Sequence, residues 1–255
     1  MPPLADRQSI AQRVDKHKLL STHPFFRTFA RSIIDRLVSH AITRRVKKGT
    51  VLFRKGDPGA NLYAVCAGSV RISVPSAQGH DAILNLILPG ELFGEIALLD
   101  GGARTADAIA MESSELMVIE RRDFIPLIRE HPDVAMQLIE VVCARLRRTS
   151  EQVEDIVFLG LPERLAKALL QLHSRSAAST GSTIRITQRD LSQMIGVSRE
   201  STNKLLRDWQ RRGWLKLGRG GLTVLASKAL ADFISGMPEA HRAPAQPDAA
   251  PRAKA

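Results

Sequence analysis

A regular series of turn signals between residues 42 and 119 restricts the fold more than any other feature of the sequence. Short apolar stretches alternate there with turn residues about every eight to twelve positions. The turns are Lys48-Gly49, Gly56-Asp57-Pro58-Gly59, Ala67-Gly68, Gln78-Gly79, Pro89-Gly90 and Gly101-Gly102. Residues 62–65 and 70–74 run apolar or alternate as strands do. Such spacing predicts a sandwich or barrel of antiparallel strands.

Helical patterns flank this β segment. Within residues 1–40, apolar residues recur at three- and four-residue steps (Phe25, Phe26, Phe29, Ile33, Ile34 and Leu37), which predicts an amphipathic helical region. Helix is expected again near Asp123, and a long helix from Pro132, which suits a helix start, to about Phe158.

The long helix carries a heptad seam. Its members are Ile139, Val142, Leu146, Thr149, Val153 and Ile156, at steps of 3, 4, 3, 4 and 3 residues. The seam favours pairing with a second copy of the chain; the alternative is an ordinary helix packed on the β domain. Charged neighbours of the seam indicate solvated sides of the helix (Arg145, Arg147, Arg148, Glu151 and Glu154).

A break at Gly160-Leu161-Pro162 predicts a second domain, which begins with a helix from about Pro162 to His173. Residues 176–182 have the composition of a surface loop. Residues 238–255 hold four prolines and seven alanines without a large apolar residue, which predicts a disordered tail.

Basic charge is concentrated in the last third of the chain. Residues 1–159 hold 21 Lys/Arg and 19 Asp/Glu, whereas residues 160–255 hold 16 Lys/Arg and 7 Asp/Glu. The net charge of +11 therefore lies mostly in the second domain. That makes the second domain the candidate for a polyanionic partner, although a merely basic surface is the simpler alternative.

The second domain contains a helix-turn-helix spacing. Residues 187–190 form a capping box, and Leu191, Met194 and Ile195 form one face of a short helix. Gly196 suits a tight turn, and Ser198 suits the N-cap of a second helix. Residues 213–225 then predict a β-hairpin with Gly218-Arg219-Gly220-Gly221 at its tip, which is the wing of a winged helix-turn-helix.

The exposed side of the second helix carries residue types that read DNA bases. Arg and Lys donate to guanine O6 and N7, and Glu accepts from cytosine N4. The candidate DNA-binding residues are Thr187, Arg189, Ser198, Arg199, Glu200, Asn203 and Lys204. The alternative for Arg199, Glu200 and Lys204 is a solvated helix face, but their place in this motif and in the basic domain favours DNA contact.

Residues 93–106 have the chemistry of a small phosphate site. Gly94 permits close approach of a ligand, and the carboxylate of Glu95 can accept from a sugar hydroxyl. Backbone N–H groups at a short helix start, from about Ile96 through Ala97 to Leu98, can hold an anion. Arg104 supplies charge-assisted donors to a phosphate, and Thr105 adds a hydroxyl. The residues alone leave a β-turn with a Glu–Arg ion pair equally open.

Other residues limit the function classes. Cys66 and Cys143 cannot form a disulfide framework or a four-cysteine cluster, and are expected as small core or helix-face residues. The seven histidines are scattered, and His80-Asp81 is expected as a surface pair, so neither a metal site nor a metal-dependent phosphodiesterase is expected. With neither a signal pattern nor a membrane-length apolar run, the expected location is the cytoplasm and no membrane partner is expected.

These motifs together resemble the CRP/FNR family of bacterial regulators over roughly residues 25–235. The resemblance implies an α+β fold: an N-terminal antiparallel β-roll (a double-stranded β-helix of the cyclic-nucleotide-binding type), a long dimerisation helix and a C-terminal winged helix-turn-helix. It places the cyclic nucleotide on Gly94, Glu95, Ile96, Ala97, Arg104 and Thr105. It further implies that Thr149 and the partner subunit's Ser150 reach the purine, and that the Arg199–Glu200 pair reads a TGTGA-like half-site.

The sequence departs from cAMP-binding members of the family at three positions. Lys204 replaces an arginine, so its contact becomes a point charge. Asn203 replaces a glycine, and Thr105 replaces a serine. A threonine like Thr105 helps to select guanine in some eukaryotic domains, so cGMP stays open, while the intact Thr149–Ser150 pair favours cAMP.

We therefore predict four segments: a cyclic-nucleotide domain over 1–131, a dimerisation helix over 132–159, a DNA-binding domain over 160–237 and a tail over 238–255. The predicted function is a homodimeric, non-enzymatic transcription regulator that responds to cAMP and binds a palindromic operator in double-stranded DNA. RNA polymerase is an expected partner, near residues 174–182. Binding of cGMP, DNA binding without ligand, phosphodiesterase activity, and control of another enzyme or channel are the alternatives.

Overall fold

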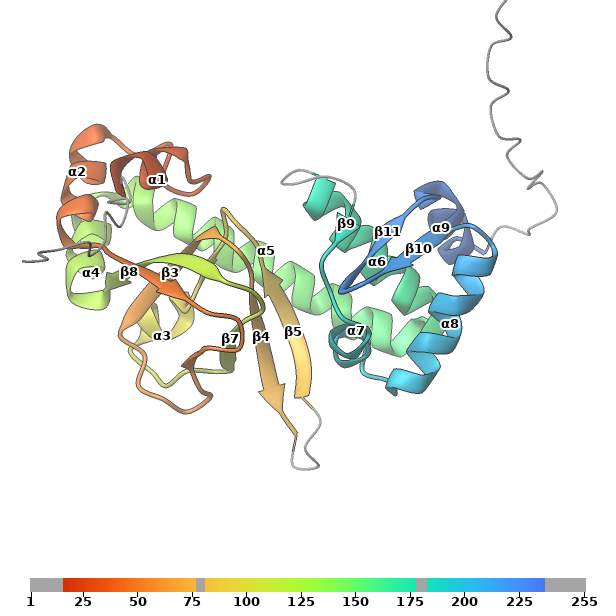
Figure 1. The fold of residues 1–255 in the computed structure, drawn as a ribbon. Coiled ribbons are helices and arrows are strands. Elements are labelled where there is room, and N and C mark those ends of the chain that lie inside the picture. The colour runs from red at the N-terminus through yellow and green to blue at the C-terminus, as the bar shows by residue number, and fades with distance from the viewer. Residues whose placement is uncertain (1–15, 77–80, 178–182, 237–255) are drawn as a thin grey trace, which may run out of the picture. The chain divides into compact units, whose positions relative to one another are not determined.

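The computed structural model describes residues 16–76, 81–177 and 183–236 (Figure 1). Contacts divide the chain into two compact units: residues 1–158 with 189–198, and residues 159–188 with 199–255. No helix among the described residues is both long and apolar enough to cross a membrane. The predicted tail and the Gln78-Gly79 turn with His80 lie outside the described residues.

The N-terminal region is less helical than its periodicity predicts. Helix α1 spans Lys16–Thr22 and α2 spans Arg31–His40, but residues 23–29 form turns. The prediction of helix through Phe25, Phe26 and Phe29 is therefore wrong. These rings pack edge-to-face in the core, and Pro24 disfavours helical backbone at the residue before it.

The predicted antiparallel β-roll is confirmed as two four-stranded sheets. Their orders are β1-β8-β3-β6 and β2-β7-β4-β5, and neighbouring strands in both sheets pair antiparallel. The strands are β1 (Ile42–Val46), β2 (Val51–Phe53), β3 (Asn61–Ala67), β4 (Val70–Pro75), β5 (Asp81–Ile87), β6 (Leu92–Phe93), β7 (Asp107–Ala110) and β8 (Ser114–Glu120). Alternate strand residues meet in a core that includes Val65, Val70, Ile87, Phe93 and Leu116.

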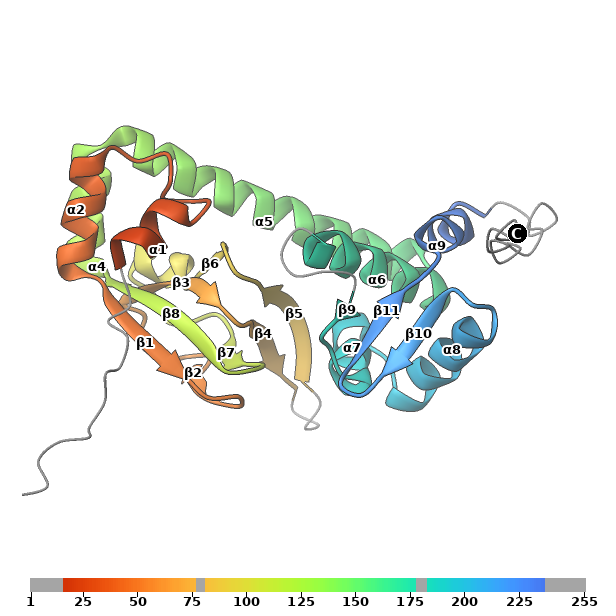
Figure 2. The ribbon, with the colours of Figure 1, turned by 45° about the horizontal axis from the view of Figure 1, so that its top comes forward.

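Three helices complete this unit: α3 (Glu95–Asp100), α4 (Arg121–Glu130) and α5 (Pro132–Phe158). Figure 2 shows α5 as a long rod along the β-roll. Only Val134 and Leu138 of α5 are buried. The seam is instead open: Ile139, Leu146, Val153 and Ile156 are each 50% exposed or more. The alternative of a seam packed on the β domain is therefore wrong for these four residues, whereas Val142 is half-buried.

The second unit surrounds its own small core. Its elements are α6 (Leu161–Ala177), β9 (Thr183–Ile184), α8 (Arg199–Arg211), β10 (Leu215–Gly218), β11 (Gly221–Val224) and α9 (Ser227–Ile234). Helix α7 (Gln188–Ile195) lies between β9 and α8 in the sequence. Trp209, Trp214 and Phe233 pack against one another in tilted and edge-to-face arrangements, with ring centroids about 6 Å apart.

The predicted wing is present as the hairpin of β10 and β11, with Gly218 opposite Gly221. Gly220 turns the chain with a φ of 80°, a conformation that side chains other than glycine rarely adopt. The loop expected from residue 176 is partly wrong, because α6 continues through Ala177. Residues 170–177 contain mostly good helix formers, which outweigh two serines. Cys66 and Cys143 are both free and half-buried.

Candidate functional site

A glycine turn places Glu95 at the start of α3. Gly94 precedes the helix with a φ of 84°. A side-chain carbon at this position would lie 2.7 Å from Nη1 of Arg104 and 2.9 Å from the carbonyl oxygen of Asn61. Only glycine therefore allows the backbone to come this close to the arginine.

Glu95 is a buried carboxylate with one oxygen in use. Its side chain is 1% exposed, and Oε1 accepts a hydrogen bond from Nη1 of Arg145 at 2.5 Å. Nη2 of Arg145 donates to the carbonyl of Leu92 at 2.7 Å. Oε2 of Glu95 has no hydrogen-bond partner among the described residues. Because a buried oxygen without a partner is costly, this atom is ready to accept from a ligand hydroxyl.

Arg145 corrects one expectation from the sequence. Its position beside the seam predicted a solvated side chain, but it is half-buried and ion-paired. The physical reason is tertiary: β6 and α3 bring a carbonyl and a carboxylate beside this face of α5. Arg145 lies four residues before Thr149, so the two share one helix face, and that spacing was the available signal.

Arg104 is a buried cation held by backbone. It is 4% exposed, and its two terminal nitrogens donate to the carbonyls of Gly94 and Asn61, each at 2.9 Å. The guanidinium lies 4.2 Å from the ring centre of Phe53. Burial lowers the pKa of Arg104. Among the described residues it makes no ion pair, so an anion in the cavity would supply the missing counter-charge.

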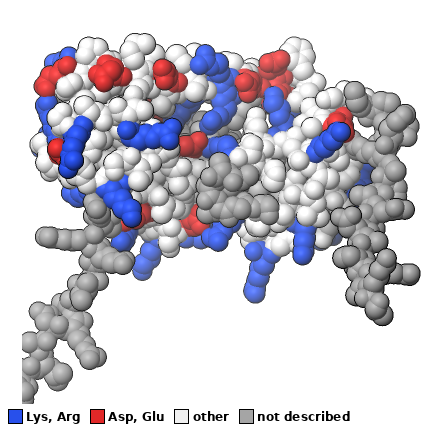
Figure 3. Space-filling view, turned by 90° about the horizontal axis from the view of Figure 1, so that it is seen from above, with Lys and Arg blue, Asp and Glu red and all other residues white. Residues whose placement is uncertain are grey.

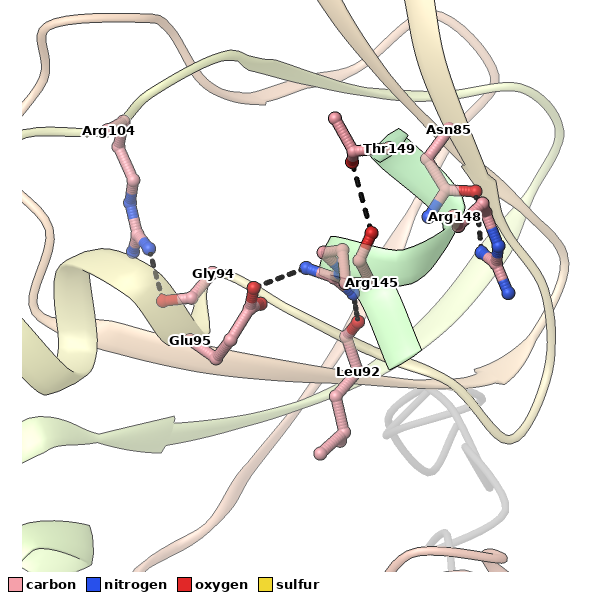
Figure 4. Close-up of polar contacts among 8 residues, drawn as sticks. All are labelled: Asn85, Leu92, Gly94, Glu95, Arg104, Arg145, Arg148 and Thr149. Carbon is pink, nitrogen blue, oxygen red and sulfur yellow. Dashed lines mark hydrogen bonds and ion pairs between the residues drawn. The ribbon is translucent and has the colours of Figure 1, made fainter. Parts of the chain in front are cut away.

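These groups line one cavity of about 310 Å³, at the small end of the range for small-molecule sites. Its walls come from the β-roll, α3 and α5. Of the predicted ligand residues, Gly94, Glu95, Ile96, Ala97, Arg104, Thr105 and Thr149 line it. Figure 4 shows Arg104 on one side of the site and Thr149 with Asn85 on the other.

Of the predicted ligand residues, Ser150 does not line the cavity of its own chain. Its hydroxyl donates to the carbonyl of Leu146 on the exposed side of α5. Further lining residues were not predicted as ligand residues, among them Phe53, Asn85, Arg145, Arg148 and Gln152. Nothing in the sequence around Asn85 marked a polar strand residue as part of the site.

Helix α8 forms the second candidate site. Arg199, Glu200 and Lys204 are exposed, while Asn203 is half-buried. A shallow hollow on this helix is lined by Glu200, Asn203, Lys204, Arg207, Gln210 and Arg211. Gln210 and Arg211 were not predicted. These hydrogen-bond donors and the one carboxylate lie on the same side of α8, which suits contact with base edges in the major groove.

The remaining predicted DNA-binding residues lie around the two short helices. Thr187 directly precedes α7, Arg189 lies in its first turn and Ser198 directly precedes α8; all three are exposed. On the face of the molecule in Figure 3, charged side chains of both signs are interspersed. Surface charge on that face therefore does not single out a binding site.

The chain matches two families in the order that its two sites suggest. Residues 43–131 match the cyclic nucleotide-binding domain, and residues 163–233 match the Crp-like helix-turn-helix domain. These ranges contain the β-roll with Glu95 and Arg104, and the helices α7 and α8.

Similar proteins include two with cyclic AMP in their names. The CRP-like cAMP-activated global transcriptional regulator of Mycobacterium tuberculosis is 34% identical over 72% of this chain and 84% of its own length. The cyclic AMP receptor protein of Thermus thermophilus is 34% identical over 84% of this chain and 98% of its own length.

A solved structure supports the same fold. FixK2 of Bradyrhizobium japonicum superposes with a TM-score of 0.67 at 21% identity, covering 75% of this chain and 96% of that one. At this identity the likeness concerns the fold alone. The M. tuberculosis relative is named as a regulator of transcription, and neither it nor the helix-turn-helix match indicates an enzyme family.

Proposed function

Because this chain belongs to the CRP/FNR family of transcription regulators, we propose that it is a homodimer that binds cAMP in its β-roll and a palindromic operator through α8. One observation carries the proposal. Glu95 and Arg104 are both buried at the same cavity, one with an unpartnered oxygen and the other without an anionic partner among the described residues.

The two groups suit the two polar parts of a cyclic nucleotide. Oε2 of Glu95 accepts from the ribose hydroxyl, while Arg104 and Thr105 bind the single negative charge of the cyclic phosphate. Phe53 and Ile72 provide apolar wall. The names of the similar M. tuberculosis and T. thermophilus proteins support cAMP as the ligand.

Dimerisation is proposed to occur along the open seam of α5. Large apolar side chains at 50–65% exposure, including Ile139, Leu146 and Ile156, are costly to leave in water and repeat at the spacing of a two-helix coiled coil. Replacing Leu146 by Lys should yield monomers in sedimentation analysis, whereas the same change at the exposed non-seam Arg147 should leave the dimer intact. A dimeric L146K protein would contradict this assignment.

Nucleotide and dimer are coupled through Thr149 in this proposal. Thr149 lies on the seam and also lines the cavity, so a purine there contacts the surface on which the second helix packs. Ser150 is then supplied by the partner copy. Ligand binding would change the packing of two α5 helices and bias the DNA-binding domains toward an operator-competent state. Thr149→Ala should weaken nucleotide-dependent DNA binding; unchanged activation would contradict the coupling.

The decisive experiment measures binding of the full chain to a TGTGA-type palindrome with cAMP, with cGMP and without nucleotide. We expect tight binding with cAMP alone. A response to cGMP would change the ligand, and equal binding in all three conditions would remove the sensor function. Hydrolysis of cAMP by the purified protein would indicate a phosphodiesterase instead.

A further inference from the structure

The side of the cavity opposite Arg104 contains a polar pair, of which Thr149 is a predicted ligand residue and Asn85 is not. Asn85 on β5 and Thr149 on α5 both line the cavity there (Figure 4). We call these two residues the purine end of the cavity. Arg148 lies next to Asn85, and its Nη1 donates to Oδ1 of Asn85 at 3.1 Å.

Arg148 fixes the orientation of the Asn85 amide. A guanidinium has only donors, so the amide must turn its oxygen toward Arg148. The reversed amide would set N–H against N–H. Asn85 therefore presents its NH₂ group to whatever occupies the purine end.

Thr149 has the opposite polarity. Its hydroxyl donates its one hydrogen to the carbonyl of Arg145 at 3.0 Å, which leaves oxygen lone pairs for a ligand. The purine end thus offers an acceptor at Thr149 beside a donor at Asn85. The protein's own hydrogen bonds set both polarities.

From this arrangement we propose that Asn85 and Arg148 select adenine over guanine; the inference rests on the proposed nucleotide function. The amine at position 6 of adenine donates to Thr149, and the neighbouring ring nitrogen accepts from Asn85. Guanine has an oxygen at position 6 that would face the lone pairs of Thr149. On its N1 edge, guanine would also set an N–H against the NH₂ of Asn85.

The two residues have different roles. Asn85 contacts the base, whereas Arg148 is a positioning residue that acts through Asn85. A site built around fixed hydrogen bonds discriminates strongly, because the wrong ligand leaves its polar groups unpaired. Removing Arg148 should therefore reduce discrimination by letting the amide turn over, with a smaller loss of cAMP affinity than removal of the Asn85 donors.

Calorimetric titration of the full chain with cAMP and with cGMP tests the proposal. Asn85→Asp keeps the size and the Arg148 contact but replaces the donors by an acceptor. We expect the ratio of cAMP to cGMP affinity to fall about ten- to a hundredfold in N85D. Arg148→Met should lower the ratio by less, and Arg147→Met, at an exposed neighbour outside the cavity, should leave it unchanged.

Ligands that lack one nitrogen identify the contacted atom. In the wild-type protein, 7-deaza-cAMP or 1-deaza-cAMP should bind more weakly than cAMP, according to which nitrogen accepts from Asn85. In Asn85→Ala that analogue and cAMP should bind alike. Equal losses in both proteins for both analogues would overturn the proposal, as would an unchanged affinity ratio in N85D. A wild-type protein that binds neither cyclic nucleotide would instead overturn the proposed function itself.

Discussion

The cavity and the face of α8 use the same charged residue types in opposite surroundings. In the cavity, Glu95 and Arg104 are almost fully buried. Glu95 is held by a hydrogen bond from Arg145, and Arg104 by one to the carbonyl of Gly94. On α8, Glu200 and Lys204 are exposed. A buried charge without a counter-charge is energetically unfavourable until a ligand of opposite charge binds, whereas water solvates an exposed charge. The buried charges therefore point to a ligand class, and the exposed ones acquire meaning only against a docked partner.

The largest effect should come from the buried cation. Arg104→Met keeps much of the side-chain length but removes the charge that faces the proposed phosphate. Removing one partner of a desolvated charge pair costs about 2–5 kcal/mol, so cAMP affinity should fall roughly thirtyfold or more by calorimetry. The exposed Arg54→Met is the matched control and should bind normally. Equal affinities in the two folded variants would break the contrast between buried and exposed charge.

A third buried ionisable group, His23, sharpens the contrast because burial favours its neutral form. His23 is 5% exposed, and burial lowers its pKa to about 4 from 6.5. Below pH 6.5 the unfolded chain binds a proton that the folded chain does not, so stability falls between pH 6.5 and about 4 and then levels off. At pH 5 the loss should be about 2 kcal/mol.

Urea unfolding at pH 7.5 and pH 5 measures this loss. His23→Asn should show a pH dependence smaller than that of the wild-type protein by about the same amount, even if it is less stable at both pH values. His40→Asn, at an exposed histidine, should retain the wild-type difference. If the His23 variant lost as much stability between pH 7.5 and pH 5 as the wild-type protein, burial of His23 would not be the cause of the pH dependence.

The sequence could reveal features that depend on local patterns, but not contacts that only the fold creates. Strands, turns and the heptad seam are local patterns with fixed periods. They predicted a sandwich or barrel of antiparallel strands, the long helix α5 and the wing, whereas the β-roll was predicted from the family resemblance. Phe25 and Phe29 misled because their helical spacing lost to aromatic packing around Pro24. Arg145 and Asn85 were missed as site residues because only the fold brings them to Glu95 and Thr149.

The contribution of Glu200 should be smaller and specific to sequence. Glu200→Ala removes the acceptor for cytosine but also a negative charge near phosphates. Affinity for a TGTGA-type palindrome should fall about tenfold, while binding to unrelated DNA stays equal or tightens, measured by fluorescence anisotropy with saturating cAMP. Lys204→Met, one turn further along α8, is the comparison: it should weaken binding to both DNAs if Lys204 contacts phosphate, and lower the slope of log affinity against log salt by about 1. If Glu200→Ala weakened binding to both DNAs equally, this carboxylate would support the fold of α8 rather than read a base. Like Glu95 in its ion pair with Arg145, it would then act through contacts within the protein.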